Sequence, residues 1–97
     1  MNLASKYGNT PFLRAVRENQ LQTVKVLAEL GANINATNSE GKGAAIIASK
    51  EKYYSMAELL VSLSVDVEIA DNDEYKAVKY AYFNSDSKMD KILKVNR

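Results

Sequence analysis

Hydrophobic side chains recur along this chain at the spacing of short amphipathic helices. In the first third of the chain they form two runs, which are separated by the polar pair Asn19-Gln20. The runs consist of Phe12, Ala15 and Val16, followed by Leu21, Val24, Leu27 and Ala28. Spacings of three and four residues place each run on one face of a helix. The pattern therefore predicts two short antiparallel helices joined by a tight turn.

The same pattern returns with a period of 33 residues. Lys52-Tyr53 and Ser85-Asp86 interrupt the later runs at the positions that correspond to Asn19-Gln20. Identical residues recur at this period at Gly8 and Gly41, Ala15, Ala48 and Ala81, Glu18 and Glu51, Leu27, Leu60 and Leu93, and Leu30 and Leu63. Helices this short are not stable alone, so each unit has to bury its apolar face on the next unit. The repetition predicts an all-α solenoid.

Turn-forming residues mark the ends of the predicted helices. Thr10-Pro11 is typical of a helix start, with the hydroxyl as N-cap and proline at the first helical position. Gly31-Ala32 ends the second helix, and segment 33–41 is rich in residues that favour turns. Segment 64–74 has the same layout, with Ser64 in the place of the glycine. We expect both segments to form projecting, hairpin-like loops.

These motifs resemble the ankyrin-repeat family, whose pattern runs G-x-T-P-L-H-x-A-A, then a second helix, then L-L-x-x-G-A-x-x-N. The first unit matches this pattern at Gly8, Thr10, Pro11, Ala15, Val24, Leu27, Gly31, Ala32 and Asn35. The resemblance covers nearly the whole chain and implies paired antiparallel helices with hairpin-like loops. We predict a single domain over residues 1–97, with approximate repeats at 5–37, 38–70 and 71–97, the last a partial C-terminal cap.

The later units depart from the family pattern at their helix starts. “GAAI” and “KAVK” stand where the family has T-P-L-H, Glu74 replaces the glycine of the third unit, and the chain has no histidine. In this family the threonine and histidine normally join the hairpin base to the helix by hydrogen bonds. The departures predict less firmly held loops in the second and third units, with the helix pairs unaffected.

The composition narrows the possible functions. Thirteen basic and twelve acidic residues give a net charge of +1, which argues against binding of nucleic acid or of an anionic membrane. Without histidine or cysteine the chain lacks the usual general base, thiolate nucleophile and zinc ligands. We therefore expect no enzymatic activity, no cofactor and no metal site.

Three short motifs have some features of ligand or catalytic sites without fitting them. “EGKGAA” (40–45) lacks the glycine spacing and the Ser or Thr of a phosphate loop. “DNDEY” (71–75) lacks the glycine and glutamate of a calcium loop, so we interpret it as an acidic, solvated loop with Asp71 at its tip. Glu18 and Glu51 fall on neighbouring inner helices, but at helix ends that we expect to be exposed and outside any cleft.

Six tyrosines and two phenylalanines make aromatic residues the main candidates for binding anchors. Tyr54 shares an apolar position with Leu21, and we expect it to pack in the core together with Tyr80 or Tyr82. The remaining aromatic residues of interest fall at positions that the family exposes on hairpin tips and inner helices. These are Tyr7, Tyr53, Tyr75 and Phe83.

The resemblance implies non-catalytic binding of another protein on the concave face made by hairpin tips and inner helices. Carried over by register, this face consists of Lys6, Tyr7, Asn9, Arg17, Glu18, Ser39, Glu40, Lys42, Lys50, Glu51, Tyr53, Asn72, Asp73, Tyr75, Phe83 and Asn84. The rim would be more basic in the first unit and more acidic in the third. The alternative is that the chain is a fragment or regulatory module of a longer ankyrin-repeat protein, for example a secreted bacterial effector, packed on neighbouring repeats or domains.

The two ends of the predicted repeat array differ in how well their apolar surfaces are covered. Segment 87–95 places apolar residues on one side and lysines on the other, which is typical of a C-terminal cap. Only Leu3 and Tyr7 are available to cover the N-terminal flank, which makes it a candidate for self-association. The chain shows no classical signal peptide, so the expected compartment is the cytoplasm, with non-classical secretion left open.

Overall fold

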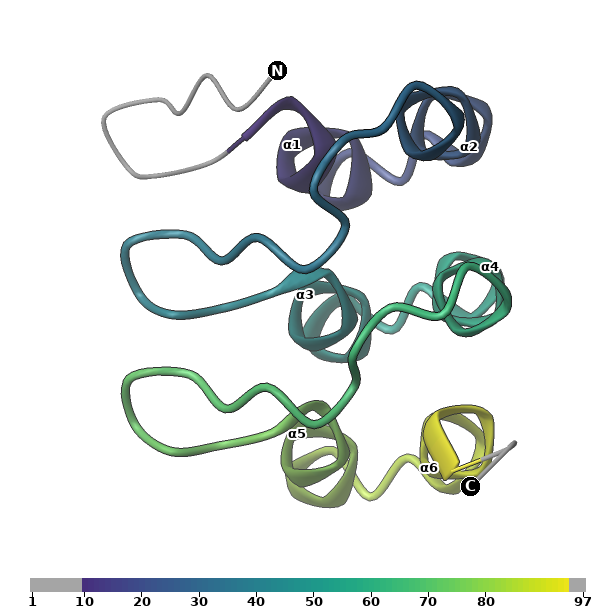
Figure 1. Cartoon of the computed structure of the whole chain (residues 1–97). Helices are drawn as coiled ribbons and strands as arrows, with labels where there is room; N and C mark the ends of the chain where they lie inside the picture. Colours follow the sequence, from purple (N-terminus) through teal and green to yellow (C-terminus); the bar gives the residue numbers. More distant parts are fainter. Residues whose placement is uncertain (1–9, 95–97) are drawn as a thin grey trace.

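Six α-helices make up the part of the chain, residues 10–94, that this computed structural model describes. They are α1 (Pro11–Arg17), α2 (Leu21–Glu29), α3 (Ala44–Glu51), α4 (Tyr54–Ser62), α5 (Ala77–Phe83) and α6 (Ser87–Lys94). Helices α1, α3 and α5 form one column, α2, α4 and α6 form a second, and the loops project beyond the first column (Figure 1). No strand occurs in residues 10–94, so the prediction of an all-α fold of paired helices is confirmed.

Left-handed backbone positions recur with the sequence period. A residue with positive φ lies in the turn between the two helices of each pair. Others lie at the C-terminal ends of α2 and α4 and at the loop tips. The positions are Asn19, Lys52 and Ser85 (φ 57°, 62° and 52°), Gly31 and Ser64 (91° and 66°), and Gly41 and Glu74 (79° and 68°). Glycine favours this conformation, yet five of the seven residues are not glycine. The repeated architecture therefore fixes the backbone more strongly than the residue type does.

The first helix starts as its sequence predicts. The Thr10 hydroxyl accepts a hydrogen bond from the N–H of Leu13 at 3.2 Å, and Pro11 occupies the first helical position. Helices α3 and α5 begin after Gly43 and Lys76, which provide no side-chain cap. Thr10 and Pro11 therefore have a structural role that the later units do without.

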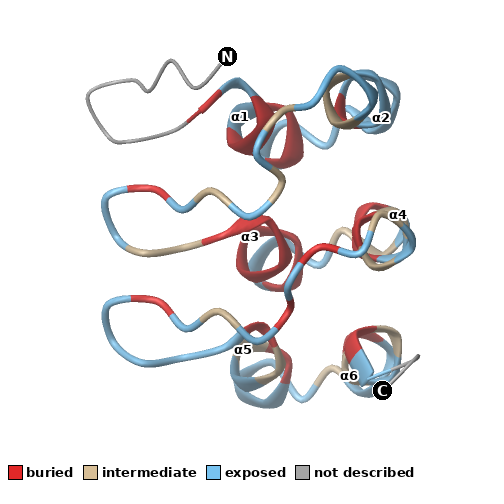
Figure 2. Ribbon diagram, viewed as in Figure 1, coloured by how far each residue is buried: buried red, intermediate tan, exposed pale blue. Residues whose placement is uncertain are grey.

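The core lies between the two columns and between successive units (Figure 2). Helix α3 is the most enclosed element, and all of its residues from Ala44 to Ser49 are buried. The predicted apolar faces are buried or half-buried, with one exception in α2. Leu21 is 38% exposed because it opens the helix and therefore lies at the rim of the interface between units.

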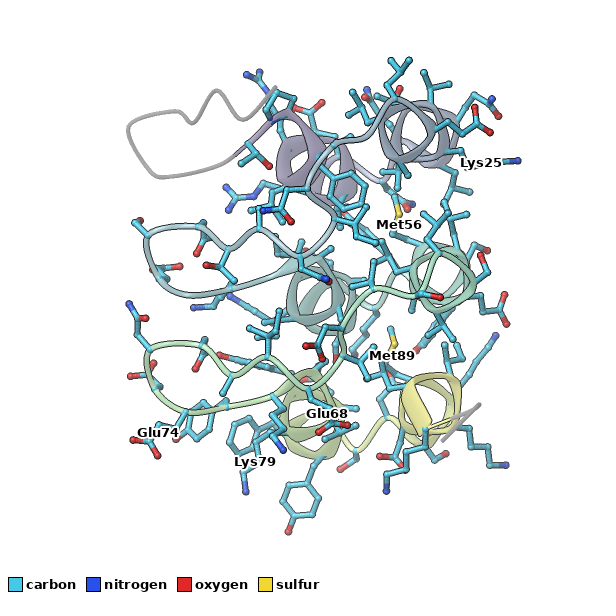
Figure 3. All side chains as sticks on the ribbon, viewed as in Figure 1. Lys25, Met56, Glu68, Glu74, Lys79 and Met89 are labelled. Atoms are coloured by element: carbon cyan, nitrogen blue, oxygen red, sulfur yellow. The ribbon has the colours of Figure 1, made fainter. Side chains whose placement is uncertain are left out.

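Buried methionines mark the contacts between outer helices. Met56 lies between α2 and α4, and Met89 lies between α4 and α6 (Figure 3). Polar contacts also join the units: the Ser49 hydroxyl donates to the carbonyl of Ala77 at 2.9 Å. Helix α6 buries Met89 and Leu93 and exposes its lysines, as its sequence predicts. No helix within residues 10–94 is long and apolar enough to cross a membrane.

Candidate functional site

The loop between α2 and α3 (residues 30–43) leads into the second helix pair and the loop between α4 and α5 (residues 63–76) into the third, so we call them the second and third loops. The second loop is organised by one buried asparagine, Asn38. The Oδ1 atom of Asn38 accepts hydrogen bonds from the N–H groups of Glu40 and Lys42, at 2.9 and 3.0 Å. The N–H of Asn38 donates to the carbonyl of Lys42 at 3.1 Å and closes the hairpin. The Asn38 side chain therefore accepts hydrogen bonds from backbone N–H groups of its own turn, as asparagine commonly does in turns.

Asp71 has the same role in the third loop, 33 residues later. Its Oδ1 accepts from the N–H groups of Asp73 and Tyr75 at 2.9 and 3.0 Å, and its own N–H donates to the carbonyl of Tyr75 at 3.0 Å. These contacts hold the loop without the threonine and histidine of the family pattern. The expectation of poorly held loops is therefore not supported by the hydrogen bonding.

The Asp71 side chain is fully buried, so the prediction that it lies in a solvated loop tip is wrong. Its Oδ2 accepts a short hydrogen bond from the Tyr80 hydroxyl and lies 3.9 Å from the Lys42 ammonium. Burial raises the pKa of Asp71, but the Tyr80 hydroxyl, the N–H groups of Tyr75 and Asp73, and Lys42 together hold the pKa below its ordinary value. Burial and this carboxylate raise the pKa of Tyr80.

The second and third loops are joined to each other through Asn72. Its backbone N–H donates to the carbonyl of Glu40 at 2.9 Å, and its Nδ2 donates to the carbonyl of Ser39 at 3.0 Å. Lys42 pairs with Glu40 at 3.3 Å while it approaches Asp71. Three predicted site residues, Ser39, Glu40 and Asn72, thus present exposed side chains on a hydrogen-bonded stack of loops.

Two predicted binding residues are engaged within the molecule. The Lys42 side chain is only 13% exposed, because it lies between the second and third loops. Tyr53 is half-buried against the core, and its hydroxyl donates to the carbonyl of Arg17 at 2.9 Å across the first two units. Tyr53 is therefore less exposed than predicted, and its hydroxyl also serves the contact between units.

The other predicted residues of the inner helices are exposed near the helix ends. Glu18 forms an ion pair with Arg14 one turn earlier, at 3.2 Å. Because both side chains are exposed, the pair contributes little to the stability of the fold. The exposed set consists of Arg17, Glu18, Lys50, Glu51, Phe83 and Asn84. Lys6, Tyr7 and Asn9, together with Leu3 of the N-terminal flank, lie outside the described residues.

An aromatic cluster covers the third loop and α5. Tyr75 and Phe83 are 36% and 52% exposed, and their rings meet edge to face with centroids 5.3 Å apart. Tyr80 is half-buried beneath them and contacts both rings. Tyr82 is 74% exposed, so Tyr80 is the residue that packs. The structure thus brings Tyr75 and Phe83 together, as neighbouring candidates on one surface.

Tyr54 packs as expected, though only half-buried. Its hydroxyl donates to Asp86 at 2.9 Å, and the hydrogen bond to this carboxylate raises the pKa of Tyr54. The Lys88 ammonium lies 4.7 Å from the centre of the Tyr54 ring. These contacts connect α4 to α6 and leave Tyr54 outside the candidate surface.

The sequence did not predict the pairing of Asp71 with Tyr80, or which of Tyr80 and Tyr82 packs. The only signal in the sequence for the first is that Asp71 shares a register position with Asn38, both of which favour turns. Within residues 10–94, no three acidic side chains gather closely enough to hold a metal ion. The arrangement offers aromatic and charged contacts on a hydrogen-bonded frame, which suits recognition of a partner surface.

Comparisons with known proteins agree with this architecture. A family model described as “Ankyrin repeats (many copies)” matches residues 12–61, more than half of the chain. The fold is similar to that of an ankyrin repeat domain from Acinetobacter baumannii AYE, with a TM-score of 0.81 and 26% sequence identity. The match covers 91% of this chain and 47% of that one, so this chain spans about half of its length. A comparison with curated protein sequences finds no match.

Proposed function

This chain belongs to the ankyrin-repeat family, and from that premise we propose that it binds a partner protein, without catalysis, on its concave face. Ankyrin repeats are generally protein-interaction modules. The concave face consists of the loop tips and the exposed ends of α1, α3 and α5. The observation that carries the proposal is the exposed pair Tyr75 and Phe83, because aromatic residues held on a fixed frame are favoured anchors at interfaces.

The charges around this pair support a directional contact. Within the described residues, the first unit carries Arg14 and Arg17 against Glu18, which leaves one positive charge, whereas Asp73 and Glu74 give the tip of the third loop two negative charges. A partner with the opposite gradient would be steered into one orientation. The aromatic pair lies toward the acidic end and would supply most of the binding energy.

Replacing both aromatic residues tests the proposal. A partner is first captured from the native source and identified by mass spectrometry, and its affinity is then measured by calorimetry. Tyr75→Ala together with Phe83→Ala is expected to weaken binding at least tenfold and to leave the helical circular dichroism intact. Lys25→Ala, an exposed change on α2, is the control. Unchanged affinity in the double variant would contradict the site.

A second candidate function is packing against neighbouring repeats or domains through the N-terminal flank. Leu30 is 67% exposed and Val26 is also exposed, whereas their register equivalents Leu63 and Leu59 are half-buried against the core. Such apolar side chains favour contact with another surface, including a second copy of the chain. Light scattering over a range of concentrations tests the contact between copies: self-association that Val26→Ser with Leu30→Ser abolishes supports it, and a strict monomer contradicts it.

A further inference from the structure

The outward face of the third unit differs from the equivalent faces of the units before it. In the second unit Ile46 and Ser49 are buried, and the Ser49 hydroxyl reaches the carbonyl of Ala77 in the next unit. The residues at the same register positions of α5 are Lys79 and Tyr82, and both are exposed. The third unit therefore presents a long cation and an aromatic ring where an earlier unit presents core residues.

This face is hollowed between the third loop, α5 and α6. The hollow has a volume of about 650 Å³, and we call it the end-face groove. Asp73 and Glu74 line it from the loop, Lys79 and Tyr82 from α5, and Asp90 from α6. Figure 3 shows Glu74 on the loop and Lys79 on α5, at the end of the molecule away from α1. Acidic, basic and aromatic groups thus meet in one groove.

Two of the lysines around the groove are already paired. The ammonium of Lys76 lies 3.0 Å from the carboxylate of Glu68, and that of Lys94 lies 3.2 Å from the carboxylate of Asp90. Both pairs are exposed and individually weak, yet each offsets one positive charge of the groove locally.

The third lysine shows that the aromatic rings accept a cation. The Lys79 ammonium lies 5.2 Å from the centre of the Tyr82 ring and 5.4 Å from that of the Phe83 ring. Both distances are within the range of a cation–π interaction. With this contact in place, Tyr82 is still 74% exposed.

The two carboxylates of the third loop that line the groove form no ion pair with the described residues. Asp73 and Glu74 are exposed, and neither forms an ion pair within residues 10–94. The hydrogen bonds that Asp71 makes to the loop backbone fix the place where both side chains start. Within the part of the chain that the structure describes, Lys79 supplies one unpaired positive charge against these two carboxylates, so the groove keeps one net negative charge, and it lies beside an aromatic ring.

The loop stack also offers unused backbone acceptors. In the second loop the carbonyls of Ser39 and Glu40 accept hydrogen bonds from Asn72. The equivalent carbonyls of the third loop belong to Asn72 and Asp73, and they accept none from the described residues. An extended chain placed along this edge could donate its N–H groups to them and continue the stack.

We propose that the end-face groove binds an extended segment of a partner protein that carries arginine. The planar guanidinium stacks on the exposed Tyr82 ring and forms forked hydrogen bonds with the carboxylate of Asp73 or Glu74. The segment's backbone donates to the free carbonyls of the third loop. This site goes beyond the proposed concave-face function, because it takes another class of ligand and does not require that partner. The two sites adjoin at the third loop, where Asp73 and Tyr75 of the concave face also line the groove.

The experiment uses a short peptide as the probe and the full chain labelled with ¹⁵N. Acetyl-Gly-Arg-Ala-Arg-Gly-amide is titrated while amide chemical shifts are followed by NMR. We expect saturable shifts in segments 72–82 and 90–94. The same peptide with citrulline, which keeps the shape and loses the charge, is expected to bind at least fivefold more weakly, and a glutamate peptide is expected not to bind.

Variants identify the groups responsible. Asp73→Asn with Glu74→Gln, and separately Tyr82→Ala, are each expected to raise the dissociation constant of the arginine peptide at least fivefold. Glu29→Gln with Glu58→Gln removes the same number of charges from exposed positions on α2 and α4 and is expected to change nothing. The dispersion of the amide spectrum shows that each variant is folded.

Several results would overturn the inference. These are the absence of binding at millimolar peptide, equal binding of the citrulline peptide, tighter binding of the glutamate peptide, and equal loss in the control variant. Shifts confined to the inner-helix ends would also overturn it. Phe83 does not line the groove, so Phe83→Ala alone is expected to weaken binding of the concave-face partner and to leave the dissociation constant of the arginine peptide unchanged. Either proposal can therefore fail while the other stands.

Discussion

The second and third loops have the same backbone hydrogen-bond pattern, but different side chains organise them. Asn38 and Asp71 each accept two backbone N–H groups at 2.9 to 3.0 Å and close their hairpins with the same backbone bond. Only Asp71 carries a charge, and only its side chain also accepts from Tyr80 and faces Lys42. The neutral amide is thus sufficient for the turn, while the carboxylate additionally connects the turn to α5 and to the second loop.

The two loop tips show a second difference, in their left-handed residues. A Cβ atom on Gly41 would lie 2.6 Å from Oδ1 and 2.8 Å from the backbone nitrogen of Asn72. The third loop has Glu74 at this position, with φ at 68°. Glycine is therefore favoured where a following loop stacks closely, and a side chain is accepted in the third loop, against which no further loop stacks within residues 10–94. This loop is also where we place the arginine site.

Removing the Asp71 side chain is expected to have the largest effect. Asp71→Ala deletes hydrogen bonds to a charged acceptor and leaves the Tyr80 hydroxyl without its partner, which together cost about 3 kcal/mol of unfolding free energy. Asn38→Ala, which deletes only neutral bonds, is the matched control and should cost about half as much. Urea denaturation followed by circular dichroism measures both. Equal losses would show that the carboxylate adds nothing to the turn.

Blocking the loop stack is expected to have the next largest effect. Gly41→Ala combines an unfavourable left-handed φ of 79° with overlap on Asn72 and should cost about 2 kcal/mol. Gly31→Ala has the same backbone problem, at φ 91°, but no atom within 4 Å of the added Cβ, so it should cost about 1 kcal/mol. The difference between the two variants in urea denaturation measures the stacking. If the two losses agree, the close approach to Asn72 is unimportant.

The sequence predicts the fold well because the 33-residue period repeats both the apolar pattern and the turn positions. Thr10-Pro11 marks the first helix, and the helix ends follow from Gly31 and its equivalent Ser64. Each of these signals is local and recurs in register. The helix pairs were therefore predictable even where glycine and threonine are replaced.

The burial of Asp71 was not predictable from the same signals. Locally the residue belongs to a run of polar and acidic residues, which is typical of a solvated loop. Its actual partners are Tyr80, nine residues later, and Lys42 of the preceding loop, and only the packed structure brings them together. The half-burial of Tyr53 was not predictable for the same reason, because its hydrogen bond is to Arg17 in another unit. The exposure of Tyr82 depends on the absence of a covering unit within the described residues.

Removing only the charge of Asp71 is expected to have a smaller, pH-dependent effect. Asp71→Asn reproduces the group found at Asn38, so it should keep the turn and cost about 1 kcal/mol at pH 7. The pKa of Asp71 is lowered on folding, so its stabilising contribution is fully present above about pH 4 to 5 and is lost as the pH falls through the folded-state pKa. Stability curves of the wild type and Asp71→Asn should therefore converge in acid. Curves that stay parallel between pH 7 and pH 2 would contradict this.

Relieving the backbone at Glu74 is expected to have the smallest effect and the opposite sign. Glu74→Gly places in the third loop the residue that the second loop has at Gly41, and it removes the left-handed penalty at φ 68°. Part of this gain is offset because glycine makes the unfolded chain more flexible, so the net stabilisation should be about 0.5 kcal/mol, or roughly 3 °C in the melting temperature. Glu74→Gln, which keeps the backbone restriction and removes the charge, should leave the melting temperature unchanged. A lower melting temperature in Glu74→Gly would mean that the glutamate stabilises the loop itself, whereas the predicted rise would show that a side chain is retained here at a small cost, as expected of a residue that serves binding.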